Sequence, residues 1–197
     1  MRLNVKNFIF LTIVLNISKV QSKLKVRHRY REKYACKGFN VMENFDVSKF
    51  GGTWFEILAY PNLYTSDGKC VLSTYAEISF GIFDLYVKFV DSLGNEMKSL
   101  GRAEYEKPGI LSVKFPSSPI GDALFHIIST DYENYAVVGA CNKFTGLYRG
   151  NNVWILSRTS YLDPRYLASA LTDINNNGLS ITYLKWTPQV CGFSSIF

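Results

Sequence analysis

Histidine is nearly absent from this chain of 197 residues, which contains only two. No Cys-x-x-Cys motif occurs, so the sequence lacks the usual ligand pattern of a zinc site. It also lacks a recognisable Ser-His-Asp arrangement or a signature of paired catalytic carboxylates. These absences argue against a metal centre and against an enzyme.

Long apolar runs are also scarce, and the one that stands out lies near the N-terminus, at residues 8–17. Arg2 and Lys6 precede it, and Val20-Gln21-Ser22 follows it, which is the pattern of a cleaved signal peptide over residues 1–22. A membrane span needs roughly 20 apolar residues, so this run is too short to be one. The sequence therefore predicts a secreted, extracellular protein whose residues 36–197 form one domain.

The positive charge is unevenly distributed along the chain. The formal net charge is +6, but residues 23–37 alone hold seven Lys or Arg and one acid, and residues 1–22 hold three more basic residues. Residues 23–35 are therefore a basic arm, and the rest of the chain is mildly acidic. The arm is either a solvated N-terminus or a segment that docks on an anionic membrane surface, a lipoprotein or a polyanion. The export signal argues against a nucleic-acid partner.

Four cysteines, Cys36, Cys70, Cys141 and Cys191, are present. An even number in an exported chain predicts two disulfides, and the residues alone allow three pairings. Pairing of all four would leave no catalytic thiol.

Short segments of alternating polarity follow one another at a spacing near ten residues, with turn residues between them. Residues 82–90 are an example, because Phe83, Leu85, Val87 and Phe89 share one face. The predicted strands are residues 53–60, 71–78, 82–90, 97–106, 110–115, 123–130, 135–142 and 152–158. Eight antiparallel strands with short connections predict an all-β, up-and-down barrel that can hold one small ligand. A β-sandwich is the alternative fold.

One helix is expected after the eighth strand. Asp163 suits the N-cap, Pro164 the first turn, and Asn177-Gly178 the end of the helix. Its apolar face should pack outside the barrel. A short strand over residues 179–186 is expected next.

Three separated motifs give the chain a family resemblance. They are Gly52-Thr53-Trp54 at the first strand, Thr130-Asp131-Tyr132 between the sixth and seventh, and Arg158 after the eighth. Their order and spacing resemble the lipocalin family, in particular the branch of apolipoprotein D, Lazarillo and the insect bilin-binding proteins. The resemblance implies that Arg158 lies over the face of Trp54 at the closed end of the barrel.

The same resemblance implies the disulfides Cys36–Cys141 and Cys70–Cys191, both structural. Two features depart from the branch. Residues 23–197 contain no Asn-x-Ser/Thr glycosylation site, and the basic arm is unusually long.

The inward faces of the predicted strands give a candidate ligand-binding set, in which Tyr75 matches a pocket tyrosine of the family. The set is Tyr75, Phe83, Leu85, Val87, Phe89, Ala103, Leu111, Val113, Phe115, Phe125, Ile127, Ala136, Val138 and Trp154. The polar loop over residues 62–69 would lie at the mouth as a lid.

The resulting hypothesis is a carrier for a small lipophile, such as a fatty acid, retinoid, bilin, sterol or pheromone. No cofactor is expected unless a bilin chromophore is the ligand. The alternative is a secreted adhesive or inhibitor that acts through its loops and basic arm, with a vestigial cavity. Haem carriage would need an inward histidine, but His126 is predicted to face outward and His28 lies in the arm.

Overall fold

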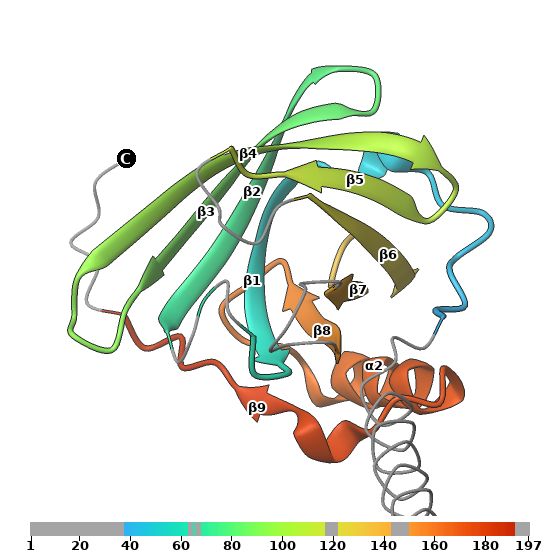
Figure 1. Cartoon of the computed structure of the whole chain (residues 1–197). Coiled ribbons are helices and arrows are strands. Elements are labelled where there is room, and N and C mark those ends of the chain that lie inside the picture. The colour runs from blue at the N-terminus through green and yellow to red at the C-terminus, as the bar shows by residue number, and fades with distance from the viewer. Residues whose placement is uncertain (1–37, 63–64, 66–67, 117–121, 143–149, 192–197) are drawn as a thin grey trace, which may run out of the picture.

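The residues that the structure describes fold into a closed antiparallel barrel with one α-helix outside it (Figure 1). The computed structural model describes residues 38–62, 65, 68–116, 122–142 and 150–191. Eight strands pair in the order β2-β3-β4-β5-β6-β7-β8-β1, and a further pairing of β1 with β2 closes the barrel. The strands are β1 (Gly52–Ala59), β2 (Lys69–Ser79), β3 (Ile82–Val90), β4 (Glu96–Lys107), β5 (Ile110–Lys114), β6 (Ala123–Thr130), β7 (Tyr135–Asn142) and β8 (Gly150–Ser157). The predicted barrel is confirmed, and this closure excludes the β-sandwich.

Alternation along each strand separates an interior from an outer surface. On β3, Phe83 and Leu85 are buried in the interior, whereas Tyr86 between Leu85 and Val87 is exposed outside. The strands run alternately between two ends. Gly52, at the start of β1, pairs with Tyr75 near one end, and Ala59 pairs with Trp154 of β8 towards the other.

We call the end near Gly52 the closed end, because the short 3₁₀ helix η1 (Val47–Lys49) precedes it there and Phe45, Val47 and Phe50 belong to the interior cluster. The other end, where the connection from β1 to β2 lies, is the open end.

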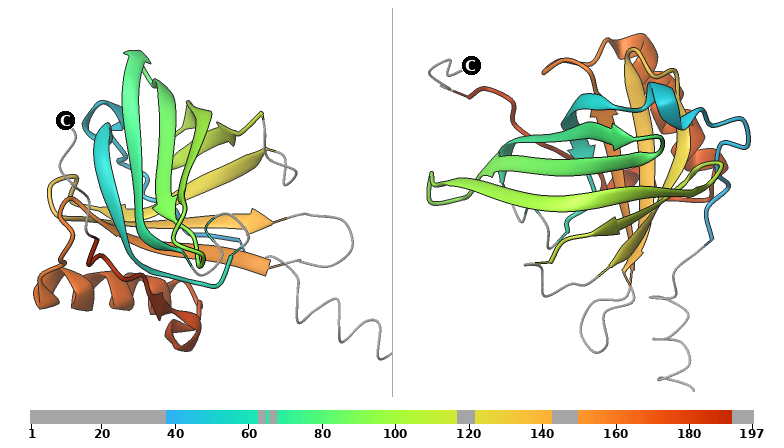
Figure 2. Two further views of the ribbon diagram at one scale, coloured as in Figure 1. Left: turned by 90° about the vertical axis from the view of Figure 1, so that its left-hand side faces the viewer. Right: turned by 90° about the horizontal axis from the view of Figure 1, so that it is seen from above.

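The helix α2 (Pro164–Asn176) packs on the outer wall, on the side of β6 and β7 (Figures 1 and 2). It begins as predicted, because the Asp163 carboxylate accepts a hydrogen bond from the Arg165 backbone N–H at 2.9 Å. Ala170 and Ile174 are fully buried in a second apolar cluster, which also contains Val137 of β7. Burial of this face fixes the helix against the barrel.

The segment after α2 differs from the predicted strand over residues 179–186. It contains a 3₁₀ helix, η2 (Ile181–Tyr183), and only β9 (Lys185–Trp186) pairs as a strand, with β1. The strand is shorter because Leu179 is buried in the outer cluster and the Ser180 hydroxyl accepts from the Thr182 N–H, which starts a turn. The β-strand prediction for residues 179–184 was therefore wrong.

In the part of the chain that the structure describes, no helix has the length and apolar character needed to cross a membrane. The predicted signal peptide (residues 1–22), the basic arm (residues 23–35) and Cys36 lie outside the described residues.

Candidate ligand-binding site

The barrel interior gathers the predicted lining residues into one apolar cluster. Every member of the predicted set except Phe89 belongs to it or packs against it. The structure therefore brings these side chains together on the inward face, and contact with a ligand stays a prediction for each. Further members that the sequence interpretation missed are Met42, Phe45, Val47, Phe50, Ala59, Tyr105, Tyr132, Ala140 and Leu156.

The closed end is built on Trp54, which has no exposed surface. The Arg158 guanidinium carbon lies 3.6 Å from the centroid of the Trp54 ring, a cation–π contact at short range. The indole N–H donates to the Phe50 carbonyl at 2.9 Å, so the polar atom of the buried ring has a partner. The predicted stacking of Arg158 on Trp54 is confirmed.

Arg158 also ties three segments of the closed end together. Its guanidinium donates to the carbonyl oxygens of Tyr132 at 2.9 Å, Thr53 at 3.0 Å and Lys49 at 3.3 Å. Gly52 is needed beside it, because its φ is +89° and a β-carbon there would lie 3.2 Å from Arg158 Nη1. These contacts give Gly52, Trp54 and Arg158 a structural role at the closed end.

The turn between β6 and β7 carries the second family motif. The Asp131 carboxylate accepts from the backbone N–H groups of Asn134 and Tyr135 at 2.8 and 3.0 Å. The Thr130 hydroxyl donates to the Tyr135 carbonyl at 2.6 Å. Tyr132 has a φ of +67°, and its hydroxyl accepts from the Asp46 N–H at 2.8 Å. The turn is therefore locked onto the segment that leads into η1.

Tyr75 lies deep in the interior, next to the closed end. Its ring packs edge-on against Phe50 at 5.3 Å and Phe83 at 6.0 Å between centroids. Burial raises the pKa of its hydroxyl, and no described residue hydrogen-bonds that group. The tyrosine therefore offers a neutral hydroxyl within the interior.

Several inward side chains towards the open end remain partly exposed. Trp154 on β8 packs against Phe125 on β6, with ring centroids 5.2 Å apart. Phe125, Val87 and Phe115 face inward yet are only partly buried. An inward side chain that keeps some exposure borders space reached from outside, which a packed core does not have.

Phe89 lies at the mouth rather than in the cluster. Its ring is so close to Gly68 that a β-carbon on that glycine would come within 2.8 Å of it. Within the same connection, the buried Thr65 donates its backbone N–H to the Asn62 side chain at 3.1 Å. The remaining residues of the predicted lid, 63–64 and 66–67, lie outside the described residues.

Glu56 is a buried acid that the sequence interpretation missed. It pairs with the inward Leu156 of β8, and its carboxylate accepts from the Thr187 hydroxyl at 2.6 Å. Burial is the main cause that raises its pKa to about 7, and the Thr187 hydrogen bond opposes this rise. Counting alternate residues from Trp54 along the strand would have placed Glu56 inside.

The C-terminal tail fills the gap that opens between β1 and β2 next to Glu56. The described pairing of β1 with β2 ends at Phe55 and Leu72, and β9 pairs with β1 beyond it. The Gln189 amide then donates to the carbonyls of Glu56 at 2.7 Å and Val71 at 3.2 Å. The tail thus completes the wall at this seam.

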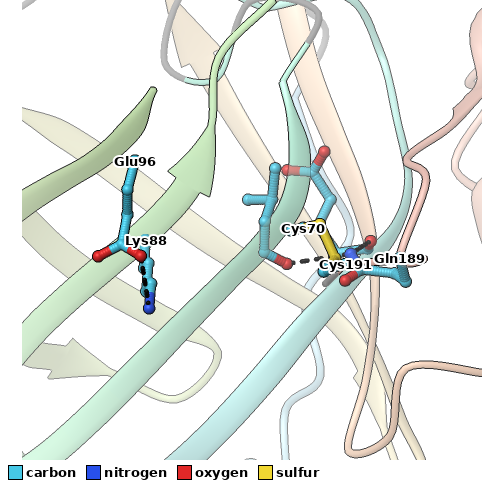
Figure 3. Close-up of a disulfide and its surroundings, with 7 residues drawn as sticks. Cys70, Lys88, Glu96, Gln189 and Cys191 are labelled. Atoms are coloured by element: carbon cyan, nitrogen blue, oxygen red, sulfur yellow. Dashed lines mark hydrogen bonds and ion pairs between the residues drawn. A yellow bond between two sulfur atoms is a disulfide. The ribbon is translucent and has the colours of Figure 1, made fainter. Parts of the chain in front are cut away.

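The disulfide Cys70–Cys191 holds this tail on β2, with Gln189 beside it (Figure 3). The two Cα atoms are 5.9 Å apart and 121 residues apart in sequence. This pairing agrees with the one that the family resemblance implied. Cys141 is also disulfide-bonded, and Cys36, its predicted partner, lies outside the described residues.

His126 faces outward, as predicted. Its neighbours Phe125 and Ile127 are in the interior cluster, whereas its own ring lies 4.9 Å from that of Phe39 on the outside. Across the described ranges, no three His, Cys, Asp or Glu residues gather in a way that could hold a metal ion.

Comparison with known proteins agrees with this architecture. Residues 45–189 match the family model of a lipocalin-like domain. Apolipoprotein D of Mus musculus is 34% identical over 158 residues, covering 78% of this chain and 82% of that protein. The Lazarillo protein of Schistocerca americana is 27% identical over 184 residues, covering 89% of this chain and 85% of that protein.

Solved structures show the same fold at lower identity. Lobster apocrustacyanin A1 superposes with a TM-score of 0.65 at 24% identity, covering 73% of this chain and 79% of that one. Insecticyanin from the tobacco hornworm Manduca sexta superposes with a TM-score of 0.66 at 22% identity, covering 77% of this chain and 85% of that one. The chain therefore belongs to the lipocalin family, whose members are known for binding and transporting small hydrophobic molecules.

Proposed function

We propose that this protein is an extracellular carrier that holds one small hydrophobic molecule inside the barrel. The observation that carries the proposal is an apolar barrel interior in which some inward side chains towards the open end remain partly exposed. Trp54 and Phe83 near the closed end are fully buried, whereas the inward Val87 and Phe125 nearer the open end are partly exposed. An apolar surface reached from one end suits a lipophile, because burial of apolar area supplies ~25 cal/mol per Å².

The disulfides support an extracellular site of action. Cys70–Cys191 joins segments far apart in sequence, and Cys141 is disulfide-bonded as well. Structural disulfides persist in oxidising compartments and are rare in the cytosol. These disulfides therefore agree with a secreted protein.

The chemistry of the interior supports a carrier rather than a catalyst. The described cysteines are all paired, and His126 points away from the interior. Glu56 is the one buried ionisable acid among the described residues, and its carboxylate is engaged by Thr187. This carboxyl is thus bound to the C-terminal tail.

Mass spectrometry of the protein purified from its native source tests the proposal. The expected result is one lipophilic molecule per chain, released by organic solvent, and a visible absorption band would identify it as a bilin. An empty protein that also fails to take up the neutral fluorescent probe N-phenyl-1-naphthylamine would contradict the proposal. The alternative of an interaction protein acting through its loops would then be favoured.

A further inference from the structure

Asn152 is a buried side chain without a hydrogen-bonding partner. It is only 6% exposed, and its amide nitrogen is buried with no partner. None of the described residues donates to or accepts from either end of the amide. A buried amide left unpaired costs about 1–3 kcal/mol, so such groups in native proteins call for an explanation.

The strand register places Asn152 on the inner face of the barrel. It stands opposite Ala140 of β7, which in turn stands opposite Phe125 of β6. Both partners belong to the interior, and Trp154, two residues further along β8, does too. Asn152 therefore lies in the open half of the interior, on the same face as the Phe125–Trp154 ring pair.

The surroundings indicate which ligand chemistry would satisfy this amide. The buried polar or charged residues of the described chain are Glu56, Thr65, Ser112, Thr130, Asn152 and Ser157. None of them is a cation, so these buried residues offer no counter-charge to an ionised carboxylate. An uncharged oxygen is different, because an amide N–H pairs with a carbonyl or hydroxyl oxygen without any counter-charge.

We propose that Asn152 is the specificity-determining residue of the site and selects a neutral lipophile that carries a carbonyl or hydroxyl oxygen. The proposal rests on the carrier function above and adds the polar group that the ligand must present. Rotation of the amide about its last bond exchanges its nitrogen and oxygen, so Asn152 can serve as donor to a carbonyl and as either partner to a hydroxyl.

Two naphthalenes of nearly equal shape test this selection. 2-Acetylnaphthalene carries one neutral carbonyl, and 2-isopropylnaphthalene replaces that oxygen by a methyl group. Their dissociation constants are measured on the lipid-free mature protein by displacement of N-phenyl-1-naphthylamine. The ratio of the two constants is compared between the wild type and Asn152→Leu, because the hydration of each ligand cancels in that comparison. 2-Naphthoic acid, ionised at pH 7, is the third ligand.

Asn152→Leu is expected to shift the ratio about tenfold in favour of the hydrocarbon, the size of one neutral hydrogen bond. Asn152→Ala should shift the ratio in the same direction, which would show that the effect does not come from poor packing of the leucine side chain. Asn151→Leu is the matched control, since Asn151 stands opposite Cys141 on the alternate face, and it should leave the ratio unchanged. 2-Naphthoic acid should bind more weakly than the ketone to the wild type.

A second readout separates ligand selection from a structural role. Without ligand, Asn152→Leu should unfold at a higher temperature than the wild type, because it removes an unpaired amide from an apolar interior. A ratio that stays constant in both Asn152 variants, or tighter binding of the naphthoate than of the ketone, would overturn the selection by Asn152. Failure of the wild type to bind the fluorescent probe or any of the naphthalenes would instead contradict the proposed carrier function.

Discussion

Trp54 and Arg158 have structural roles at the closed end of the barrel. The guanidinium covers the indole at 3.6 Å and donates to carbonyls of three separate segments. Such a stack combines apolar burial of the ring with satisfied donors on the cation. The indole therefore fills the closed end of the barrel, and the ligand is expected nearer the open end.

Trp54→Ala is expected to lower the free energy of unfolding by about 3–5 kcal/mol, because it leaves a cavity where a fully buried ring was. Urea denaturation followed by circular dichroism measures the change. Trp186→Ala is the control, since that ring is 65% exposed, and it should change stability by less than about 1 kcal/mol. If Trp54→Ala lost ligand binding while its stability stayed unchanged, the ligand site would lie at the Trp54 end of the barrel.

Glu56 should make stability depend on pH. Its pKa is about 7 when folded and near 4.5 in an exposed carboxyl, so between these values the folded protein holds a proton that the unfolded chain has lost. The wild type therefore loses stability as pH rises from 4.5 to 7. Glu56→Gln removes this loss. The difference in unfolding free energy between Glu56→Gln and the wild type should therefore be larger at pH 8 than at pH 4.5, by on the order of 2–3 kcal/mol.

Urea unfolding at the two pH values measures this difference. Glu106→Gln, an exposed acid on β4, is the matched control and should follow the wild type. Equal pH dependence in Glu56→Gln and the wild type would show that the carboxyl is not buried in the folded state.

At this scale the sequence predicted the apolar interior better than its polar groups. Phe83, Leu85 and Trp154 could be assigned because alternation alone places them inside. Glu56 and Asn152 follow the same alternation, but a polar residue at an inward position carries no local signal for its hydrogen-bonding partner. Thr187, which binds the Glu56 carboxylate, is 131 residues away. Alternation could therefore place the Glu56 side chain inside, but its hydrogen-bonding partner could not be predicted from the local pattern.

Among the elements, the tail after α2 depends most on its tertiary contacts. The strands and α2 carry local signals, and the structure places them close to the predicted bounds. The tail has only two residues in β9, and the residues after them hydrogen-bond to β1 and β2. The Cys70 N–H donates to the Pro188 carbonyl at 2.8 Å, and Thr187 N–H donates to that of Ile57 at 2.9 Å. Local propensity could not predict the short strand because these distant partners define it.

Removal of the tail disulfide should therefore open the seam. The double variant Cys70→Ser with Cys191→Ser is expected to lose about 2–5 kcal/mol of stability, since the bond joins residues 121 positions apart. Hydrogen exchange should become faster at the Cys70 position and at Thr187, while amides in the middle of β3 keep their protection. Unchanged exchange at both positions would show that the tail stays on β1 and β2 without the bond.

For the whole molecule, the closed barrel determines which faces can meet a ligand. Eight strands form a closed ring, so the inward side chains share one interior and the outward ones do not. Strand alternation and the three family motifs made this architecture predictable from sequence. The ring packing of Phe50, Tyr75 and Phe83 near the closed end was not predictable, because alternation gives the face that a side chain occupies and not its contacts.

The most direct test of the carrier function compares two adjacent residues on opposite faces of β3. Val87 faces the open half of the interior, and Tyr86 is exposed on the outer surface. In a titration with N-phenyl-1-naphthylamine, Val87→Trp should weaken binding at least about tenfold by filling the site, whereas Tyr86→Trp should bind as the wild type does. Undiminished binding by Val87→Trp, or loss of binding in Tyr86→Trp alone, would contradict a ligand site inside the barrel.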